Sequence, residues 1–185
     1  MRNAQRGFTM TELMVAAGIA AILLAVAMPS FQRTIQNNRI TAPTNKLVGD
    51  LRLARSEAMK RVQHVVMCRS ADPTAATPAC GGTTNTWTNG WIIFANADTN
   101  TTFDNGTDTL LRVGEAQNSG QLTIVTNNAG DADVVFNPDA STNESGNTLR
   151  WAVCDNRGAS YGKLIEVPPS GRARLTSATN CSTPS

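Results

Sequence analysis

Two arginines near the C-terminus have the spacing needed to bind neighbouring phosphates. In the segment Gly171-Arg172-Ala173-Arg174, which follows Pro168-Pro169-Ser170, Gly171 permits a turn with a positive φ. We expect extended chain after this turn, where alternate side chains point to the same side, so that the two guanidiniums emerge about 6–7 Å apart. A guanidinium holds a phosphate through two parallel hydrogen bonds. The pair is therefore suited to capture successive phosphates, and Arg157 and Lys163 are candidates to extend this basic patch.

A second unusual residue, Glu12, lies inside an apolar segment of residues 8–28. At about 1.5 Å per residue, a helix over this segment is roughly 30 Å long, the thickness of the hydrocarbon core of a bilayer. The sequence therefore predicts a membrane-spanning helix at residues 8–29. A carboxylate in lipid costs a few kcal/mol unless a partner offsets it, so Glu12 is a candidate functional residue.

A secretory signal peptide is the first alternative for this segment, because Arg2 and Arg6 form a basic region ahead of it. A signal peptide would not place a carboxylate directly before its apolar stretch. Its small-residue cleavage site would follow the stretch, whereas Gly7 precedes it. A plain transmembrane anchor is the second alternative, and length and hydropathy leave it open.

The composition fits one globular domain and the anchor, with 185 residues of which 41% are hydrophobic and 5% aromatic. Without Arg2 and Arg6, the 16 basic residues become 14 and match the 14 acidic residues. A site for an anionic partner must therefore be a local cluster of cations rather than a general basic field.

Residues 30–62 have the apolar periodicity of an amphipathic helix that continues beyond the membrane. We expect a bend or short break at residues 40–43, because the ring of Pro43 clashes with the preceding turn. The residues that define the apolar face recur mostly at intervals of three or four: Ile40, Leu47, Leu51, Ala54, Ala58 and Val62.

Beyond residue 63 the pattern changes to short β-branched or aromatic runs separated by Gly, Asn, Asp, Thr and Pro, which is typical of antiparallel sheets. A helix packed on such sheets gives an α+β domain, which we expect at residues 63–185. The predicted strands are residues 65–68, 91–94, 109–113, 122–125, 134–136, 149–154 and 163–167.

Four cysteines, Cys68, Cys80, Cys154 and Cys181, fall in the part of the chain that would lie outside the cytoplasmic membrane, where disulfides persist. Four cysteines permit three pairings, of which we favour the sequence-local one, Cys68 with Cys80 and Cys154 with Cys181. A zinc site that includes His64 is disfavoured, because neither pair has the spacing of a zinc ribbon or knuckle.

The N-terminal sequence resembles the prepilin processing signal of type IV pilins and pseudopilins, with basic residues, then Gly7 and Phe8, and Glu12 as the fifth residue from Phe8. The resemblance implies that a prepilin peptidase cleaves after Gly7 and methylates the new amino terminus of Phe8. Glu12 would then neutralise the terminal amine of a neighbouring subunit and set the stagger of a helical filament. Pro29 resembles the mid-helix proline of the family, which can kink or locally melt the helix.

Nearly the whole chain resembles the GspH/FimT family of minor pilins and pseudopilins, through residues 53–58 with 65–68, 90–94 and 170–174. The turn at residues 136–139 also resembles one of the family, although Ala140 stands where Gly usually follows. The resemblance implies a type IV pilin-like fold, with a leader at residues 1–7 and a long helix packed on antiparallel sheets. In FimT-like members a GRxR sequence at this place binds DNA for natural transformation, and Arg172 and Arg174 match it.

Two functions follow from this resemblance. One is a minor pilin in or at the tip of a type IV pilus-like filament that binds DNA through Gly171, Arg172 and Arg174. The other is a structural subunit that primes or caps filament assembly, as the H pseudopilin of a type II secretion system does. The competing interpretation of the arginine segment is that it serves folding, with Arg174 an ordinary solvated residue. The implied location is the bacterial inner membrane, with a single span and the β-rich domain in the periplasm or on the cell surface within a pilus.

The implied partners are the prepilin peptidase, other pilins or pseudopilins, DNA and the membrane. Trp87 and Tyr161 are weaker candidates for stacking on single-stranded DNA. The loop at residues 98–104 places oxygen ligands at alternate positions, but Phe103 replaces the glycine of an EF-hand, so we expect an ordinary polar loop. We expect no enzymatic activity, cofactor or metal, because no catalytic arrangement of residues rises above chance.

Overall fold

A computed structural model of the chain describes residues 7–82, 86–98, 100–115, 120–127, 133–143, 146–182 and 184. Its residues form two compact units, Met1–Asn38 and Arg39–Ser185. The first unit holds the N-terminal part of the long helix α1 (Met10–Arg61), whose apolar side chains are exposed there. By length and composition, α1 is long and apolar enough to cross a membrane.

Helix α1 is continuous through Pro29 and Pro43, so the break expected at residues 40–43 is absent and the chain is not melted at Pro29. Pro43 lies on the buried face of the helix, and packing there offsets the backbone hydrogen bond that its ring removes. Next to it, the hydroxyl of Thr44 donates to the carbonyl of Ile40 at 2.6 Å. The proline is thus accommodated by its surroundings rather than by a break in the helix.

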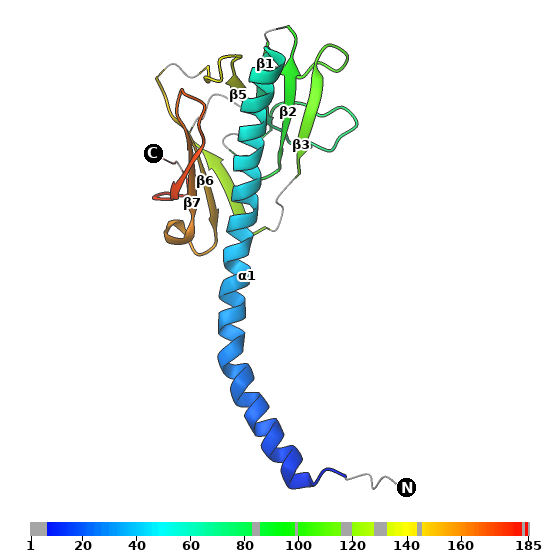
Figure 1. The fold of residues 1–185 in the computed structure, drawn as a ribbon, viewed down its shortest axis with the longest axis vertical. Helices are drawn as coiled ribbons and strands as arrows, with labels where there is room; N and C mark the ends of the chain where they lie inside the picture. Colours follow the sequence, from blue (N-terminus) through cyan, green and yellow to red (C-terminus); the bar gives the residue numbers. More distant parts are fainter. Residues whose placement is uncertain are drawn as a thin grey trace. The chain divides into compact units, whose positions relative to one another are not determined.

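The second unit contains two antiparallel four-stranded sheets, ordered β3-β2-β1-β5 and β4-β6-β7-β8, with the helical residues 39–61 in front of them (Figure 1). All seven predicted strands are present, and a short 3₁₀ helix η1 (Ala159–Tyr161) precedes β7. The 3₁₀ helix η1 was not predicted, and the extended chain expected after Gly171 forms the additional strand β8 from Arg174 onwards. The strands are β1 (His64–Arg69), β2 (Trp91–Asn96), β3 (Thr109–Gly114), β4 (Leu122–Thr126), β5 (Asp133–Phe136), β6 (Leu149–Asp155), β7 (Lys163–Val167) and β8 (Arg174–Ser177).

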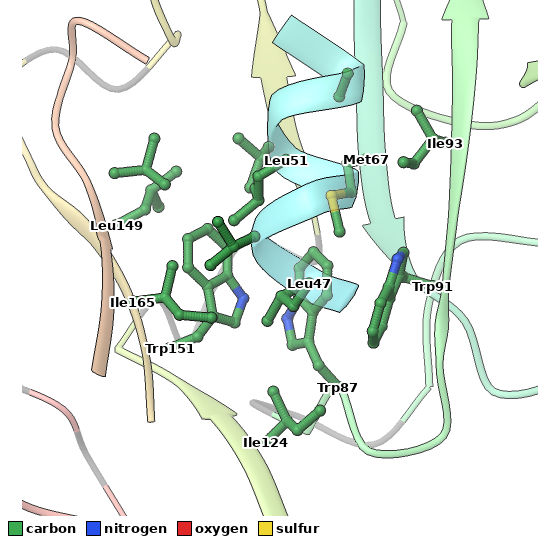
Figure 2. Packing of buried hydrophobic residues seen from close by; sticks show 14 of the residues in the cluster. Leu47, Leu51, Met67, Trp87, Trp91, Ile93, Ile124, Leu149, Trp151 and Ile165 are labelled. Atoms are coloured by element: carbon green, nitrogen blue, oxygen red, sulfur yellow. The ribbon is translucent and has the colours of Figure 1, made fainter. Parts of the chain in front are cut away.

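One core joins the helix to both sheets (Figure 2). Leu47 and Leu51 of α1 lie among residues of both sheets, and three tryptophans fill the centre of the cluster. The ring of Trp87 meets that of Trp151 edge to face at 5.5 Å. Trp87 is 1% exposed, so the proposal that it stacks on DNA bases is wrong; it belongs to the core.

The predicted apolar face of α1 is buried at five of its six positions, and Val62 is the exception. The helix ends at Arg61, and Val62 takes the left-handed conformation with φ 54°. The amide of Gln63 then donates to the carbonyl of Ala58 at 3.3 Å, which closes the helix with the 6→1 bond of a Schellman motif. The expectation that Val62 continues the apolar face is therefore wrong.

Both favoured disulfides are confirmed, Cys68–Cys80 and Cys154–Cys181, and no cysteine is free. The first ties the loop after β1 back to that strand, and the second ties the C-terminal segment to β6. Cys68 and Cys154 are themselves buried in the small apolar clusters on the outer faces of the two sheets. Each bridge therefore fastens an irregular segment to a strand.

Candidate functional site

Gly171 lies in a tight backbone contact that no other residue fits. The residue follows a turn in which its amide donates to the carbonyl of Pro168 at 2.8 Å, and its φ is 70°. A Cβ at this position would lie 2.2 Å from the carbonyl oxygen of Ala140. Because that neighbour is backbone, it cannot move aside cheaply. The glycine of the predicted motif thus has a structural role of its own.

The carbonyl of Ala140, which Gly171 approaches, also accepts a hydrogen bond from helix α1. Ala140 adopts φ 68° in a turn closed by its amide and the carbonyl of Asn137, the conformation in which a glycine would be unstrained. Nε of Arg55 on α1 donates to the Ala140 carbonyl at 3.1 Å. The turn, Gly171 and α1 therefore meet at one point, which fixes where the arginine segment begins.

Arg172 and Arg174 are both exposed, whereas Ala173 between them packs against the core. This alternation agrees with the expected extended chain, in which neighbouring side chains face opposite sides. No hydrogen bond or ion pair joins either guanidinium to another described residue. Arg174 lies opposite Glu166 in the β7–β8 pairing, and that carboxylate is bonded to Nε of Arg150 at 2.9 Å. The negative charge of Glu166 is therefore already paired with Arg150.

Arg157 is held by a local acidic partner. Its Nε donates to Oδ2 of Asp155 at 2.8 Å, and its guanidinium lies 4.5 Å from the ring centroid of Tyr161. Its side chain is 15% exposed. Lys163 pairs with Ser177, three positions along β7 from Glu166 and so about 10 Å from the level of Arg174. The structure does not bring Arg157 or Lys163 next to Arg174.

The loop at residues 98–104 is held together by its own side chains. Nδ2 of Asn100 donates to Oδ2 of Asp98 at 2.7 Å and to Oδ2 of Asp104 at 2.9 Å. Thr99 lies outside the described residues. Both carboxylates that the calcium interpretation needed as ligands are thus engaged with an amide. Within the described part of the chain, no group of three or more His, Cys, Asp or Glu side chains is placed to hold a metal.

At the start of α1, Glu12 belongs to a helix cap. Its amide donates to Oγ1 of Thr9 at 3.3 Å, and Thr9-Met10-Thr11-Glu12 has the spacing of a capping box. A carboxylate in the first turn also interacts favourably with the helix dipole. This second role of Glu12 was not predicted, although the Thr-x-x-Glu pattern is visible in the sequence. Among the described residues, the Glu12 carboxylate forms no ion pair.

The fold and these sites define a class of protein. An apolar N-terminal helix, continued by an amphipathic half that packs on two antiparallel sheets, is the architecture of pilin-like subunits. The prokaryotic N-terminal methylation motif matches residues 2–28, and the family described as type II transport protein GspH matches residues 44–171. This second match covers more than half of the chain, so the chain belongs to the GspH family. Arg172 and Arg174 lie directly beyond the matched residues.

Known proteins support the same class. The chain is 43% identical over 49 residues to fimbrial protein Q and 42% identical over 45 residues to the type IV major alpha-pilin, both of Moraxella bovis. These matches cover 26% and 24% of the chain, but only 29% and 28% of the two relatives. The type IV minor pilin FimU of Pseudomonas aeruginosa shares the fold, with a TM-score of 0.59 at 18% identity over 78% of this chain and 96% of FimU. The chain is thus a pilin or pseudopilin subunit of the type IV class.

Proposed function

We propose that this subunit is a minor pilin that binds DNA through Arg172 and Arg174 during DNA uptake for natural transformation. The observation that carries the proposal is the exposure of two arginines, Arg174 at the start of β8 and Arg172 two residues before it, without an acidic partner among the described residues. Ala173 between them is partly buried against the core, so both arginine side chains face away from it. Their carboxylate neighbour, Glu166, is bonded to Arg150. The segment therefore keeps a local positive charge in a chain whose charges are nearly balanced.

The contacts expected at this site are with phosphates. Contacts with phosphates hold the nucleic-acid backbone and carry no sequence information directly. We therefore expect binding that depends strongly on salt and weakly on sequence. Tyr161 is 55% exposed, but its ring already lies beneath Arg157, so base stacking is not part of the proposal.

The test is DNA binding by the full chain in detergent, titrated across salt, for wild type and for Arg172→Ala with Arg174→Ala. Each phosphate contact contributes about 0.9 to the slope of log affinity against log salt, so the double variant should lower the slope by about 2. Lys60→Ala with Arg61→Ala removes the same charge from the end of α1 and is the matched control. An unchanged slope in the arginine variant would discard the proposal.

A second candidate function is structural: the subunit primes or caps a filament, either a pilus or the pseudopilus of a type II secretion system. It is favoured by the exposed apolar side chains of α1 in the first unit and by the Glu12 carboxylate, which has no ion-pair partner among the described residues. In this function the Arg172→Ala, Arg174→Ala variant assembles and secretes normally. A defect of that variant in assembly or secretion would contradict it.

Both functions require the same processing. We propose that a prepilin peptidase cleaves between Gly7 and Phe8, that Phe8 is methylated, and that α1 anchors the subunit in the inner membrane with residues 63–185 on the periplasmic side. Mass spectrometry of the subunit in its working assembly should show Phe8 as a methylated N-terminus. An intact leader in assembled subunits would rule out this processing.

A further inference from the structure

A groove of about 610 Å³ runs along the exposed face of α1 beside β3, far along the chain from Arg172 and Arg174. We refer to it as the α1–β3 groove. Three cations contribute to its lining, whereas its single carboxylate is almost completely buried. The residues on which its character depends are Lys46, Gly49, Asp50, Arg52, Leu53 and Arg112.

Two of the three cations are positioned by one buried unit, Asp50 with Trp91. Asp50 is 2% exposed; its Oδ1 lies 2.7 Å from Nε of Arg112, and its Oδ2 accepts a hydrogen bond from Nε1 of Trp91 at 2.9 Å. The ammonium of Lys46 lies 5.9 Å from the ring centroid of the same tryptophan, which Figure 2 shows beside the helix. Asp50 therefore orients Arg112, half of whose side chain remains exposed, and the face of the Trp91 ring attracts the ammonium of Lys46.

Strand β3 has a glycine at the position where the Trp91 ring needs space. Trp91 pairs with Gly114 on β3, where a Cβ would lie 2.2 Å from Cε2 and Nε1 of the indole ring. Any side chain at position 114 would therefore displace the tryptophan from Asp50. Burial raises the pKa of Asp50, while its hydrogen bond with Trp91 and the charges of Arg112 and Lys46 oppose that rise. A carboxylate in contact with a guanidinium at this distance is a stable orienting group for Arg112.

The floor of the groove combines open space with an apolar contact. Gly49 on α1 has nothing within 4 Å of where its Cβ would be, so the helix offers a notch at its centre. Leu53 beside it is half-buried and supplies an apolar contact. Arg52 is exposed and forms no hydrogen bond or ion pair with a described residue. Cations around an apolar floor match carboxylates that alternate with apolar side chains, whereas a phosphate backbone would gain nothing from Leu53.

We propose that the α1–β3 groove binds an acidic segment of a neighbouring pilin subunit, whose Asp or Glu carboxylates are held by Lys46, Arg52 and Arg112. The net charge of the groove is positive, because Asp50 neutralises only one of the three cations. A protein partner is favoured over DNA by the apolar floor and by the class of the chain, since pilins associate with other pilins. The proposal does not depend on DNA binding at Arg172 and Arg174.

The test is nuclear magnetic resonance of the full chain in detergent micelles, titrated with a short oligoglutamate peptide. The peptide should shift the Nε–Hε resonance of Arg112 and the amide resonance of Gly49. Lys46→Gln and Arg52→Gln should each weaken peptide binding about two- to fivefold, the range expected for exposed ion pairs. Lys60→Gln, which removes a charge on α1 outside the groove, should leave binding unchanged.

A variant that adds bulk without changing charge tests whether the peptide binds in the groove or is only attracted by the general charge of the surface. Gly49→Gln changes no charge and has room for its side chain, and it also removes a glycine from a helix interior, so the protein should remain folded. It should weaken peptide binding by blocking the notch. The proposal is overturned if the peptide does not shift groove resonances, if Gly49→Gln and the charge variants bind like wild type, or if a short DNA duplex shifts those resonances more than the peptide does.

Discussion

The two parts of α1 are both rich in apolar residues, yet their environments are opposite. In the first unit, side chains such as Leu13, Leu23 and Ile35 are exposed by half or more, whereas Leu47 and Leu51 in the second unit are buried. Residues 13–28 are apolar on every face of the helix, while residues 40–58 are apolar on one face only. The difference shows that one part of the helix finds its apolar partner within the chain. The other part has no such apolar partner among the described residues.

The largest difference between the two parts of the helix should appear when one carboxylate is removed from each. Glu12→Ala should abolish filament assembly, because the proposed partner of Glu12 is the amine of another subunit. Glu57→Ala should assemble like wild type, because Glu57 already pairs with Lys60 and Arg61 in its own chain. Electron microscopy of sheared filaments measures the yield. Normal filaments from Glu12→Ala would refute the assembly role.

Removing one leucine from each part should give the next largest difference. Leu51→Ala leaves a cavity in the core and should lower the free energy of unfolding by about 3–4 kcal/mol. Leu23→Ala removes an exposed side chain and should change the same quantity by less than about 0.5 kcal/mol. Urea denaturation in detergent, followed by the fluorescence of the buried tryptophans, compares the two. Equal losses would mean that the first part also packs within the chain.

The end of the helix allows a gain in stability. Val62 is a β-branched residue with φ 54°, a conformation that costs non-glycine residues about 1 kcal/mol or more. Val62→Gly should therefore raise the free energy of unfolding by about 1 kcal/mol. Met59→Gly, within the helix and also exposed, should lower it by about the same amount. Both values come from the same denaturation experiment, and a loss in Val62→Gly would show that the valine side chain has a partner.

The smallest effect concerns the pH dependence of the pairs around Glu57. Its hydrogen bond with Arg61, with the charges of Lys60 and Arg61 nearby, holds the pKa of Glu57 below its usual 4.5. Because the pKa of Glu57 is lower in the folded state than in the unfolded state, its ionised carboxylate stabilises the fold at pH values above 4.5. This stabilisation is lost as the pH falls below 4.5 and through the pKa of the folded state. Arg61→Gln should slightly reduce the loss of stability between pH 6 and pH 3. Identical pH profiles would show that the pair is without effect.

Much of the fold could be predicted because its strands are short β-branched runs between turn residues, and because the apolar spacing marked the buried face of α1. For β8, only extended chain after Gly171 was predicted and not a place in the sheet, because Arg174-Leu175-Thr176-Ser177 is polar at three of four positions and exposed throughout. Its pairing with β7 is visible only in the structure. Val62 was placed on the apolar face because periodicity does not reveal where a helix ends.

The contacts at the sites could be predicted less fully than the strands. The backbone contact of Gly171 with Ala140 joins segments that are distant in sequence, so only the positive φ of Gly171 was foreseeable. Asp50 and Arg112 are also far apart in sequence, and nothing in the local pattern identifies Asp50 as buried. The pairing of Arg157 with Asp155 could have been predicted from the sequence, because only one residue separates them. The DNA-binding and leader-processing roles remain predictions.

The position of β1 has a mechanical consequence when a force pulls on α1. β1 follows α1 almost directly and lies between β2 and β5, so the first strand after the helix is hydrogen-bonded along both of its edges. To draw β1 out of the domain, both rows of hydrogen bonds must break. The Cys68–Cys80 bridge also prevents residues 69–79 from being drawn out. Tension passed from the helix to the domain would thus meet first a strand that is paired on both edges, and then a disulfide directly behind it.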